Sequence, residues 1–368
     1  MTEELVCSGC GAAIQTEDQN KAGYTPESAL EKDIIICQRC FRLRHYNEVQ
    51  DVELTHQDFS NKLHEIGNQK ALIVKVVDIF DLEGSWISGF HRYTGNNDVV
   101  LIANKADLLP KSVNQNKVVQ WLKKQAKDQG LTAKDVVLIS ASKNQGVEEA
   151  AQLIEKYRQG SDVFITGCTN VGKSTFLNQI IRLFSGEDDV PITTSHFPGT
   201  TLDIIEVMLE DGKHLIDTPG IINNRQLIHQ MHSSDWKKMM PKKEIKPIIY
   251  QLQPGQTLFV GGFARLDFEE GERNSFVAYF ANELKIHRTK LENADELMAN
   301  HLGGMLSPPS PKSVEKLGKW KRYEFIIKKD KTDIVIAGLG WFSVPKKGAK
   351  VSIHVPEGTG VSLREAIV

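Results

Sequence analysis

The 368-residue sequence has no long hydrophobic run and is poor in cysteine and aromatic residues. No apolar stretch reaches the roughly 18 residues that a membrane-spanning helix needs. The N-terminus, MTEELVCSGC, has neither the basic start nor the apolar core of a secretory signal. Five cysteines are too few for a fold held together by disulfide bonds. These absences exclude the membrane-spanning and disulfide-scaffold classes, and we expect a cytoplasmic protein with no membrane partner.

The composition is that of a soluble globular protein, with 40% hydrophobic and 25% charged residues, and the length predicts about two to three domains. The net charge of −2 conceals an asymmetry, because residues 1–220 carry −9 and residues 221–368 carry +7. A basic half favours a nucleic-acid partner. The alternative is a basic surface that is merely solvated.

Four of the five cysteines form two C-x-x-C pairs, Cys7 with Cys10 and Cys37 with Cys40, separated by 26 residues. Such a pair brings two thiolates to one metal from a single turn, and four thiolates suit tetrahedral zinc. We therefore predict a zinc site, with a redox pair or unliganded cysteines as the alternative. The basic and aromatic segment FRLRHYN (41–47) follows, and it fits either an RNA contact or a packed edge.

An alternating strand and helix pattern begins near residue 70 and predicts a doubly wound, mostly parallel α/β sheet. The expected strands are 71–81, 99–104, 136–140 and 163–166, and the expected helices are 113–129 and 147–157. After residue 245 the pattern changes to short strands joined by glycine-containing turns, with one helical segment at 293–301 and a loop at 307–312. This change predicts a β-rich C-terminal domain.

The sequence GCTNVGKS, from Gly167 to Ser174, fits the phosphate-loop pattern G-x-x-x-x-G-K-[ST] between an expected strand and an amphipathic helix. Its backbone N–H groups can surround phosphate oxygens, Lys173 can reach the β- and γ-phosphates, and Ser174 can bind Mg²⁺. The predicted phosphate-binding residues are Gly167, Cys168, Thr169, Asn170, Val171, Gly172, Lys173, Ser174 and Thr175.

Two further motifs suit the magnesium ion and the γ-phosphate. The sequence DTPG (217–220) follows a short apolar run, so Asp217 is expected to act on Mg²⁺ and the Gly220 amide to meet the γ-phosphate. The segment FPGTT (197–201) is a candidate switch loop. Thr201 is the predicted Mg²⁺ ligand in it, and Thr200 is the second choice.

Two strand-end motifs suit recognition of guanine. In NKAD, the Asp107 carboxylate can accept two hydrogen bonds from guanine, Lys105 can lie over the ring and Asn104 can tether neighbouring loops. Adenine lacks the matching donors, and a wrong base would leave a buried charge unpaired. In SAS, Ser140 and Ala141 are placed to offer a backbone N–H to guanine O6.

The motifs stand in an unusual order, with NKAD and SAS before the phosphate loop and DTPG. This order, together with the cysteine pairs and the segment CQRCFRLRHYNEVQDV, resembles the YqeH family of circularly permuted GTPases over essentially the whole chain. The resemblance implies a GTPase that assists assembly of the small (30S) ribosomal subunit. It also implies a C-terminal domain of the kind likened to the trp RNA-binding attenuation protein.

We therefore predict a zinc-finger module at 1–55, a permuted P-loop GTPase domain at 56–225 and a basic, β-rich, RNA- or protein-binding domain at 226–368. The predicted cofactors are GTP or GDP, Mg²⁺ and Zn²⁺. The predicted partners are the small ribosomal subunit, its rRNA or ribosomal proteins. The alternative function is an RNA or protein adaptor that holds GTP as a structural ligand. An ATP-dependent kinase is disfavoured by NKAD.

Catalysis is expected to be slow, because Ile221 stands where Ras-like proteins have a water-orienting glutamine. In similar GTPases, an asparagine at the position of Asn170 helps to bind K⁺, although it can equally be a loop cap. The predicted catalytic residues are Lys173, Thr201, Asp217, Gly220 and Asn170.

The RNA contact is expected on the basic half. A first lysine group follows the DTPG region, and a second group is interleaved with aromatic residues that could stack on bases. The first group is Lys237, Lys238, Lys242, Lys243 and Lys246. The second is Lys319, Lys321, Arg322, Lys328, Lys329, Lys346 and Lys347, with Trp320, Tyr323 and Trp341. The alternative is that these lysines only solvate strand edges.

Overall fold

The computed structural model describes residues 66–185, 192–196, 203–218 and 220–367, and scattered residues before them: 5, 14–17, 23–30, 35 and 37–38. These residues form two compact units. The first contains the described residues within Met1–Asp78, Trp86–Ala106 and Leu122–Ile222, and the second contains Ile79–Ser85, Asp107–Trp121 and Asn223–Val368. Within the described part of the chain, no helix is long and apolar enough to cross a membrane.

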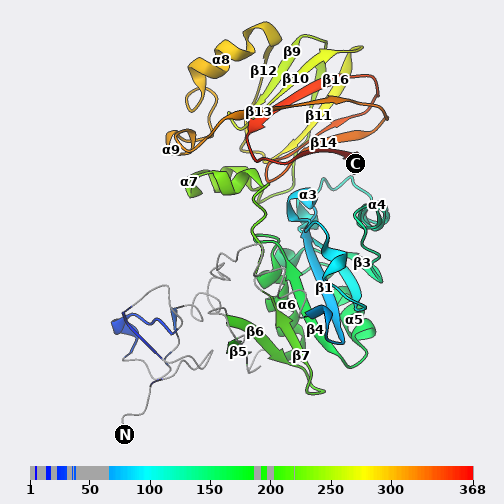
Figure 1. The fold of residues 1–368 in the computed structure, drawn as a ribbon, viewed down its shortest axis with the longest axis vertical. Coiled ribbons are helices and arrows are strands. Elements are labelled where there is room, and N and C mark those ends of the chain that lie inside the picture. The colour runs from blue at the N-terminus through cyan, green and yellow to red at the C-terminus, as the bar shows by residue number, and fades with distance from the viewer. Residues whose placement is uncertain are drawn as a thin grey trace. The chain divides into compact units, whose positions relative to one another are not determined.

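The first unit is built on a seven-stranded sheet with the order β3-β2-β1-β4-β7-β6-β5 (Figure 1). The strands are β1 (Ala71–Asp78), β2 (Asp98–Asn104), β3 (Asp135–Leu138), β4 (Asp162–Gly167), β5 (Ile192–His196), β6 (Asp203–Met208) and β7 (His214–Asp217). Strands β3, β2, β1, β4 and β7 are parallel, while β6 is antiparallel to both β7 and β5. The expected mostly parallel sheet is confirmed.

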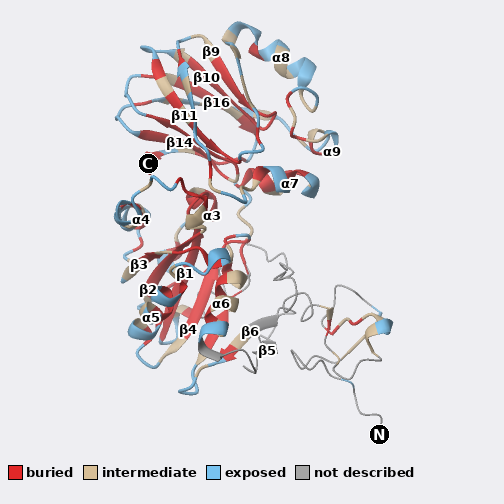
Figure 2. Cartoon of the chain, turned by 180° about the vertical axis from the view of Figure 1, so that it is seen from behind, coloured by how far each residue is buried: buried red, intermediate tan, exposed pale blue. Residues whose placement is uncertain are grey.

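Buried strands and amphipathic helices explain this layering. Every residue of β1 is buried, as a parallel strand covered on both faces requires (Figure 2). Helix α5 (Val147–Arg158) buries Val147, Ala150, Ala151 and Ile154 on one side and packs against β1, β2 and α6. The helices expected from the sequence occur as α4 (Gln115–Asp128), α5 and α6 (Lys173–Ser185). The same part of the chain contains the short helical segments η1 (Glu27–Ala29), α3 (Leu82–Ser85), η2 (Phe90–Arg92), η3 (Ala106–Leu108) and η4 (Ala141–Lys143). Of these, α3 and the last two residues of η3 belong to the second unit.

The second unit contains two five-stranded antiparallel sheets, with the orders β12-β9-β10-β16-β13 and β17-β14-β15-β11-β8. Their strands are β8 (Ile248–Leu252), β9 (Gln256–Val260), β10 (Ala264–Glu270), β11 (Asn274–Phe280), β12 (Ile286–Lys290), β13 (Trp320–Ile326), β14 (Thr332–Ile336), β15 (Gly340–Val344), β16 (Lys350–Pro356) and β17 (Val361–Glu365). The helical segments are η5 (Leu227–Gln230), α7 (Ser233–Met239), η6 (Leu291–Asn293), α8 (Ala294–His301) and α9 (Pro311–Val314).

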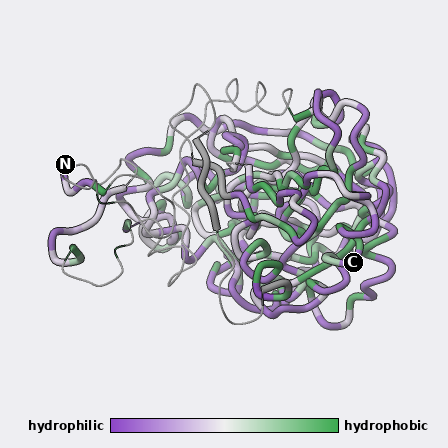
Figure 3. Tube along the Cα trace, turned by 90° about the horizontal axis from the view of Figure 1, so that it is seen from below, coloured by the Kyte–Doolittle hydropathy of each residue, from purple (hydrophilic) through white to green (hydrophobic). Residues whose placement is uncertain are grey.

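One apolar cluster joins the two sheets, with Leu266 and Phe268 from the first and Phe276 and Phe342 from the second. The two sheets pack their apolar faces against each other. Strands β14 and β15 of the second sheet are buried on both faces. Figure 3 shows green hydrophobic and purple hydrophilic stretches following one another along the coloured part of the chain. The predicted β-rich C-terminal region is confirmed.

One aromatic prediction is wrong. Trp341 was expected to offer a stacking face to RNA, but its side chain is fully buried in β15. Its ring stacks on that of Tyr279, with centroids 4.9 Å apart and planes 10° apart. The neighbouring Phe342 faces the core between the two sheets, so Trp341 points to the opposite face of its sheet. There the Phe80 ring also lies against it, with centroids 5.4 Å apart.

Candidate nucleotide site

The phosphate loop lies where the sequence predicts it, between β4 and α6. Gly172 has a φ of +85°, and a Cβ atom there would lie 2.3 Å from Asn104 Nδ2. A Cβ on Gly167 would lie 2.5 Å from the Val76 carbonyl oxygen. Both positions therefore require glycine for steric reasons. The loop leads into the first turn of a 13-residue helix, where free N–H groups favour an anion.

The lysine of the phosphate loop and the carboxylate of DTPG meet, although they are 44 residues apart in the sequence. Lys173 Nζ donates to Asp217 Oδ1 at 2.8 Å and also to the Thr218 carbonyl oxygen. Lys173 is 8% exposed and Asp217 is 6% exposed. A buried pair of this kind is costly to disrupt, because removing one partner leaves the other charge uncompensated.

The backbone after DTPG pairs with the phosphate loop. The Thr169 N–H donates to the Ile221 carbonyl at 2.8 Å, and the Ile221 N–H donates to the Gly167 carbonyl at 3.3 Å. Gly220 is buried, and a Cβ there would come within 3.2 Å of Thr169 Cγ2. The Ile221 side chain is also buried. This pairing holds the DTPG segment against the loop.

Asn104 connects three loops. Its side-chain amide donates to the Val171 carbonyl of the phosphate loop at 2.9 Å. Its carbonyl oxygen accepts from the Ala141 N–H of the SAS motif at 3.0 Å and from the Lys105 N–H at 2.8 Å. Since Asn104 is 3% exposed, each of these bonds forms away from water. The predicted tethering role therefore has the geometry that it needs.

The remaining parts of NKAD and SAS lie at the ends of β2 and β3. Lys105 has a φ of +68°, and its Nζ pairs with Asp78 Oδ2 at 2.6 Å. Asp107 lies in η3 and is half-buried. Ser140 is fully buried, and its hydroxyl lies 3.3 Å from that of Ser142.

Some predicted residues lie outside the described part of the chain. They are Thr200 and Thr201 of the switch loop and three of the four cysteines, Cys7, Cys10 and Cys40. Cys37 is described and is buried. Among the described residues, no group of three or more histidine, cysteine or acidic side chains could hold a metal ion. Ser174 and Thr175 are half-buried in the first turn of α6, while Asn170 is exposed with a φ of +62°.

Sequence reasoning missed two residues near this site. Asp78, the partner of Lys105, is the last residue of β1, and a carboxylate that ends a buried parallel strand is a signal that could have identified it. Lys75 lies in the middle of β1 and is 0% exposed. A charged residue inside an otherwise apolar strand was the available signal.

The comparisons with known proteins agree with this geometry. A family model described as "50S ribosome-binding GTPase" matches residues 162–254, and one described as "YqeH-like, C-terminal" matches residues 273–367. YqeH of Bacillus subtilis (strain 168) is 52% identical over 366 residues, which cover 100% of both chains. The chain belongs to the YqeH family of circularly permuted GTPases.

More distant relatives extend the YqeH comparison. NO-associated protein 1, chloroplastic/mitochondrial, of Arabidopsis thaliana is 28% identical over 394 residues, covering 93% of this chain and 70% of the relative. Among solved structures, GNP-bound YlqF from T. maritima is 22% identical, with a TM-score of 0.30, and the match covers 45% of this chain and 58% of that one. Membership of the YqeH family supports binding and hydrolysis of GTP.

Proposed function

We propose that this chain is a slow GTPase that acts as a switch in assembly of the small ribosomal subunit. The observation that supports it best is the buried side chain of Asn104, which joins NKAD, SAS and the phosphate loop. In a permuted chain these motifs are far apart in sequence, so their convergence favours one nucleotide site. The ribosomal part of the proposal rests on the family resemblance.

Each residue then has a role. Amides of the phosphate loop other than that of Thr169, which is engaged with Ile221, surround the phosphates. Lys173 neutralises the charge between the β- and γ-phosphates. Asp107 reads the guanine edge, Lys105 covers the ring, and the Ser140–Ala141 backbone meets O6. Gly220 offers its amide to the γ-phosphate.

Magnesium fits the oxygen donors that are present. The Asp217 carboxylate lies beside Lys173, and Ser174 begins the adjoining helix. Oxygen ligands of this kind suit Mg²⁺, and Thr201 is proposed as a further ligand. The ion would neutralise negative charge on the phosphates when bound. A zinc ion held by Cys7, Cys10, Cys37 and Cys40 also remains a proposal, tested by elemental analysis of reduced protein.

Slow hydrolysis follows from the residue after DTPG. The buried, apolar Ile221 side chain cannot orient a water molecule, and its backbone is engaged with the phosphate loop. A further element must therefore accelerate the reaction, and we propose K⁺ bound near Asn170. The positive φ of Asn170 also fits a simple turn, since asparagine tolerates that conformation. Turnover in KCl compared with NaCl distinguishes the two roles.

The deciding experiment measures GTP turnover with no addition, with purified small subunits and with purified large subunits. The proposal predicts stimulation of about tenfold or more by small subunits alone. Stimulation by large subunits alone would contradict the small subunit as the partner. The large subunit is included in the test because the family model that matches residues 162–254 is described as a 50S ribosome-binding GTPase. No stimulation by either would favour the adaptor function. Lys173→Ala serves as the control for contaminating GTPases, with its melting temperature recorded.

A further inference from the structure

Lys75 is a buried amine with no hydrogen-bond partner among the described residues. It lies in the middle of β1, it is 0% exposed, and its Nζ is among the buried polar atoms that lack a partner. Two aromatic rings lie against it, with Nζ 3.5 Å from the centroid of Trp86 and 4.2 Å from that of Phe90. An apolar residue would fill this position at lower cost, because burying an ionised amine is strongly unfavourable.

The position of Lys75 connects it with the phosphate loop. In the parallel pair of β1 and β4, Lys75 lies opposite Thr166, and Val76 lies opposite Gly167, where the loop begins. Residues opposite each other in a parallel pair direct their side chains to the same face. The Thr166 hydroxyl is a second buried polar atom without a partner among the described residues. Lys75 thus lies beside the strand that leads into the loop.

The amine changes charge in the neutral range. Burial lowers the pKa of Lys75 to about 7, and a coulombic interaction with Cys168 acts in the opposite direction. The groups that face Lys75 from the neighbouring elements are the rings of Trp86 and Phe90, the Thr166 hydroxyl and the Cys168 thiol. Asp78, on the same strand, is engaged with Lys105. Among the described residues, no carboxylate therefore pairs with the Lys75 amine to fix it in its charged form.

We propose that Lys75 is a positioning residue for the phosphate loop. The loop binds nucleotide phosphates more tightly when the Lys75 amine is protonated. A positive charge beneath the loop raises the electrostatic potential where the phosphates bind. By linkage, bound phosphates favour protonation, so binding takes up a proton. This inference rests on the proposed nucleotide site, and it assigns that site a dependence on pH.

The test compares the affinity of full-length variants for a fluorescent GDP between about pH 6.5 and about pH 8.5, where the Lys75 amine loses its proton. We expect the affinity of the wild type to fall about fivefold more than that of Lys75→Met. The phosphate of the nucleotide titrates equally with the wild type and with Lys75→Met. The difference between their two pH profiles therefore reports on Lys75. Lys117→Met, which changes an exposed lysine, should retain the wild-type pH profile. Cys168→Ala should shift the midpoint to lower pH, because it removes the coulombic interaction with Cys168 that raises the pKa of the amine.

Two further readouts separate this role from a structural one. Lys75→Met should melt at a higher temperature than the wild type, since it removes a buried amine without a partner. If Lys75→Met does not fold, calorimetry of wild-type GDP binding in two buffers of different ionisation enthalpy decides the question. Uptake of a fraction of a proton near neutral pH supports the proposal. Matching pH profiles in wild type and Lys75→Met, or no proton uptake, would overturn it. Failure of the wild type to bind GDP would instead overturn the proposed site.

Discussion

At the residue scale, the site depends on a few side chains that each connect several loops. Asn104 makes three hydrogen bonds, one within its own NKAD segment and one to each of two other loops. Its amide offers donor and acceptor atoms separately on one short, uncharged side chain. Lys173, at the start of α6, and Asp217, at the end of β7, form an ion pair. Loss of one such side chain therefore affects every segment that it joins.

We expect Asn104→Ala to lower the free energy of unfolding by about 2–3 kcal/mol, because it leaves buried backbone groups at Val171 and Ala141 without partners. GDP affinity should fall together with stability, since the phosphate loop loses its tether. Asn116→Ala, an exposed position in α4, is the matched control. Denaturant unfolding and GDP titration of the two variants check this, and equal stability of both would contradict the tethering role.

The nucleotide motifs could be predicted from sequence because each is local and each follows a recognisable strand. Strand β4, for example, covers Asp162–Gly167, close to the expected 163–166. The Lys105–Asp78 pair and the burial of Trp341 could not be predicted, because they depend on which strands become neighbours and on which residues cover the second face of a sheet. Lys75 could be recognised in the sequence as a charged residue within an apolar strand, but the rings of Trp86 and Phe90 that lie against it could not be predicted.

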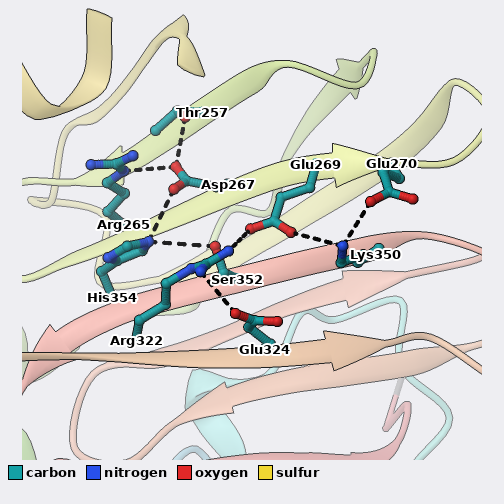
Figure 4. Close-up of polar contacts among 10 residues, drawn as sticks. All are labelled: Thr257, Arg265, Asp267, Glu269, Glu270, Arg322, Glu324, Lys350, Ser352 and His354. Carbon is teal, nitrogen blue, oxygen red and sulfur yellow. Dashed lines mark hydrogen bonds and ion pairs between the residues drawn. The ribbon is translucent and has the colours of Figure 1, made fainter. Parts of the chain in front are cut away.

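At the element scale, the sheet formed by β12, β9, β10, β16 and β13 has a polar network on the face away from its apolar core (Figure 4). At its centre, the buried Asp267 accepts from Thr257 at 2.6 Å and from Arg265 at 2.7 Å, and it lies 3.0 Å from His354 Nε2. Burial alone would raise the pKa of Asp267, but hydrogen bonds from His354, Arg265 and Thr257 outweigh it and lower the pKa.

Asp267 should therefore stabilise the β-rich unit at neutral pH. Because its pKa is lower in the folded state, this stabilisation is present above the unfolded pKa of about 4 and is lost as the pH falls below it. We expect Asp267→Asn to cost about 3 kcal/mol at pH 7 and to reduce the loss of stability in acid. Asp295→Asn is the control, because that carboxylate also pairs with Arg265 but is 91% exposed. Denaturant unfolding at neutral and acidic pH measures both, and equal effects would refute the central role of Asp267.

The polar network around Asp267 also neutralises part of the positive charge that was predicted to contact RNA. Arg322, one of the predicted RNA contacts, pairs with both Glu269 and Glu324, so its charge is already compensated. The five lysines at 237–246, by contrast, are all exposed. They remain the better candidates for phosphate contact.

At the scale of the whole molecule, the charge asymmetry predicts that association with RNA acts through the basic half. We expect a variant with Lys237, Lys238, Lys242 and Lys243 changed to glutamate to keep its GDP affinity but to lose co-sedimentation with small subunits. Changing Lys328, Lys329, Lys346 and Lys347 to glutamate alters the net charge equally and tests whether position matters. Wild-type co-sedimentation by the first variant would exclude the lysines at 237–243 as the contact.

The central claim is that motifs in permuted order form one guanine-specific site. Competition of GTP, ATP and XTP against fluorescent GDP, in wild type and Asp107→Asn, tests it most directly. The wild type should bind GTP and not ATP, and Asp107→Asn should weaken GTP by about 100-fold while gaining XTP, because the substitution exchanges an acceptor for a donor facing the base. Unchanged GTP affinity in Asp107→Asn, or equal binding of GTP and ATP by the wild type, would contradict the account.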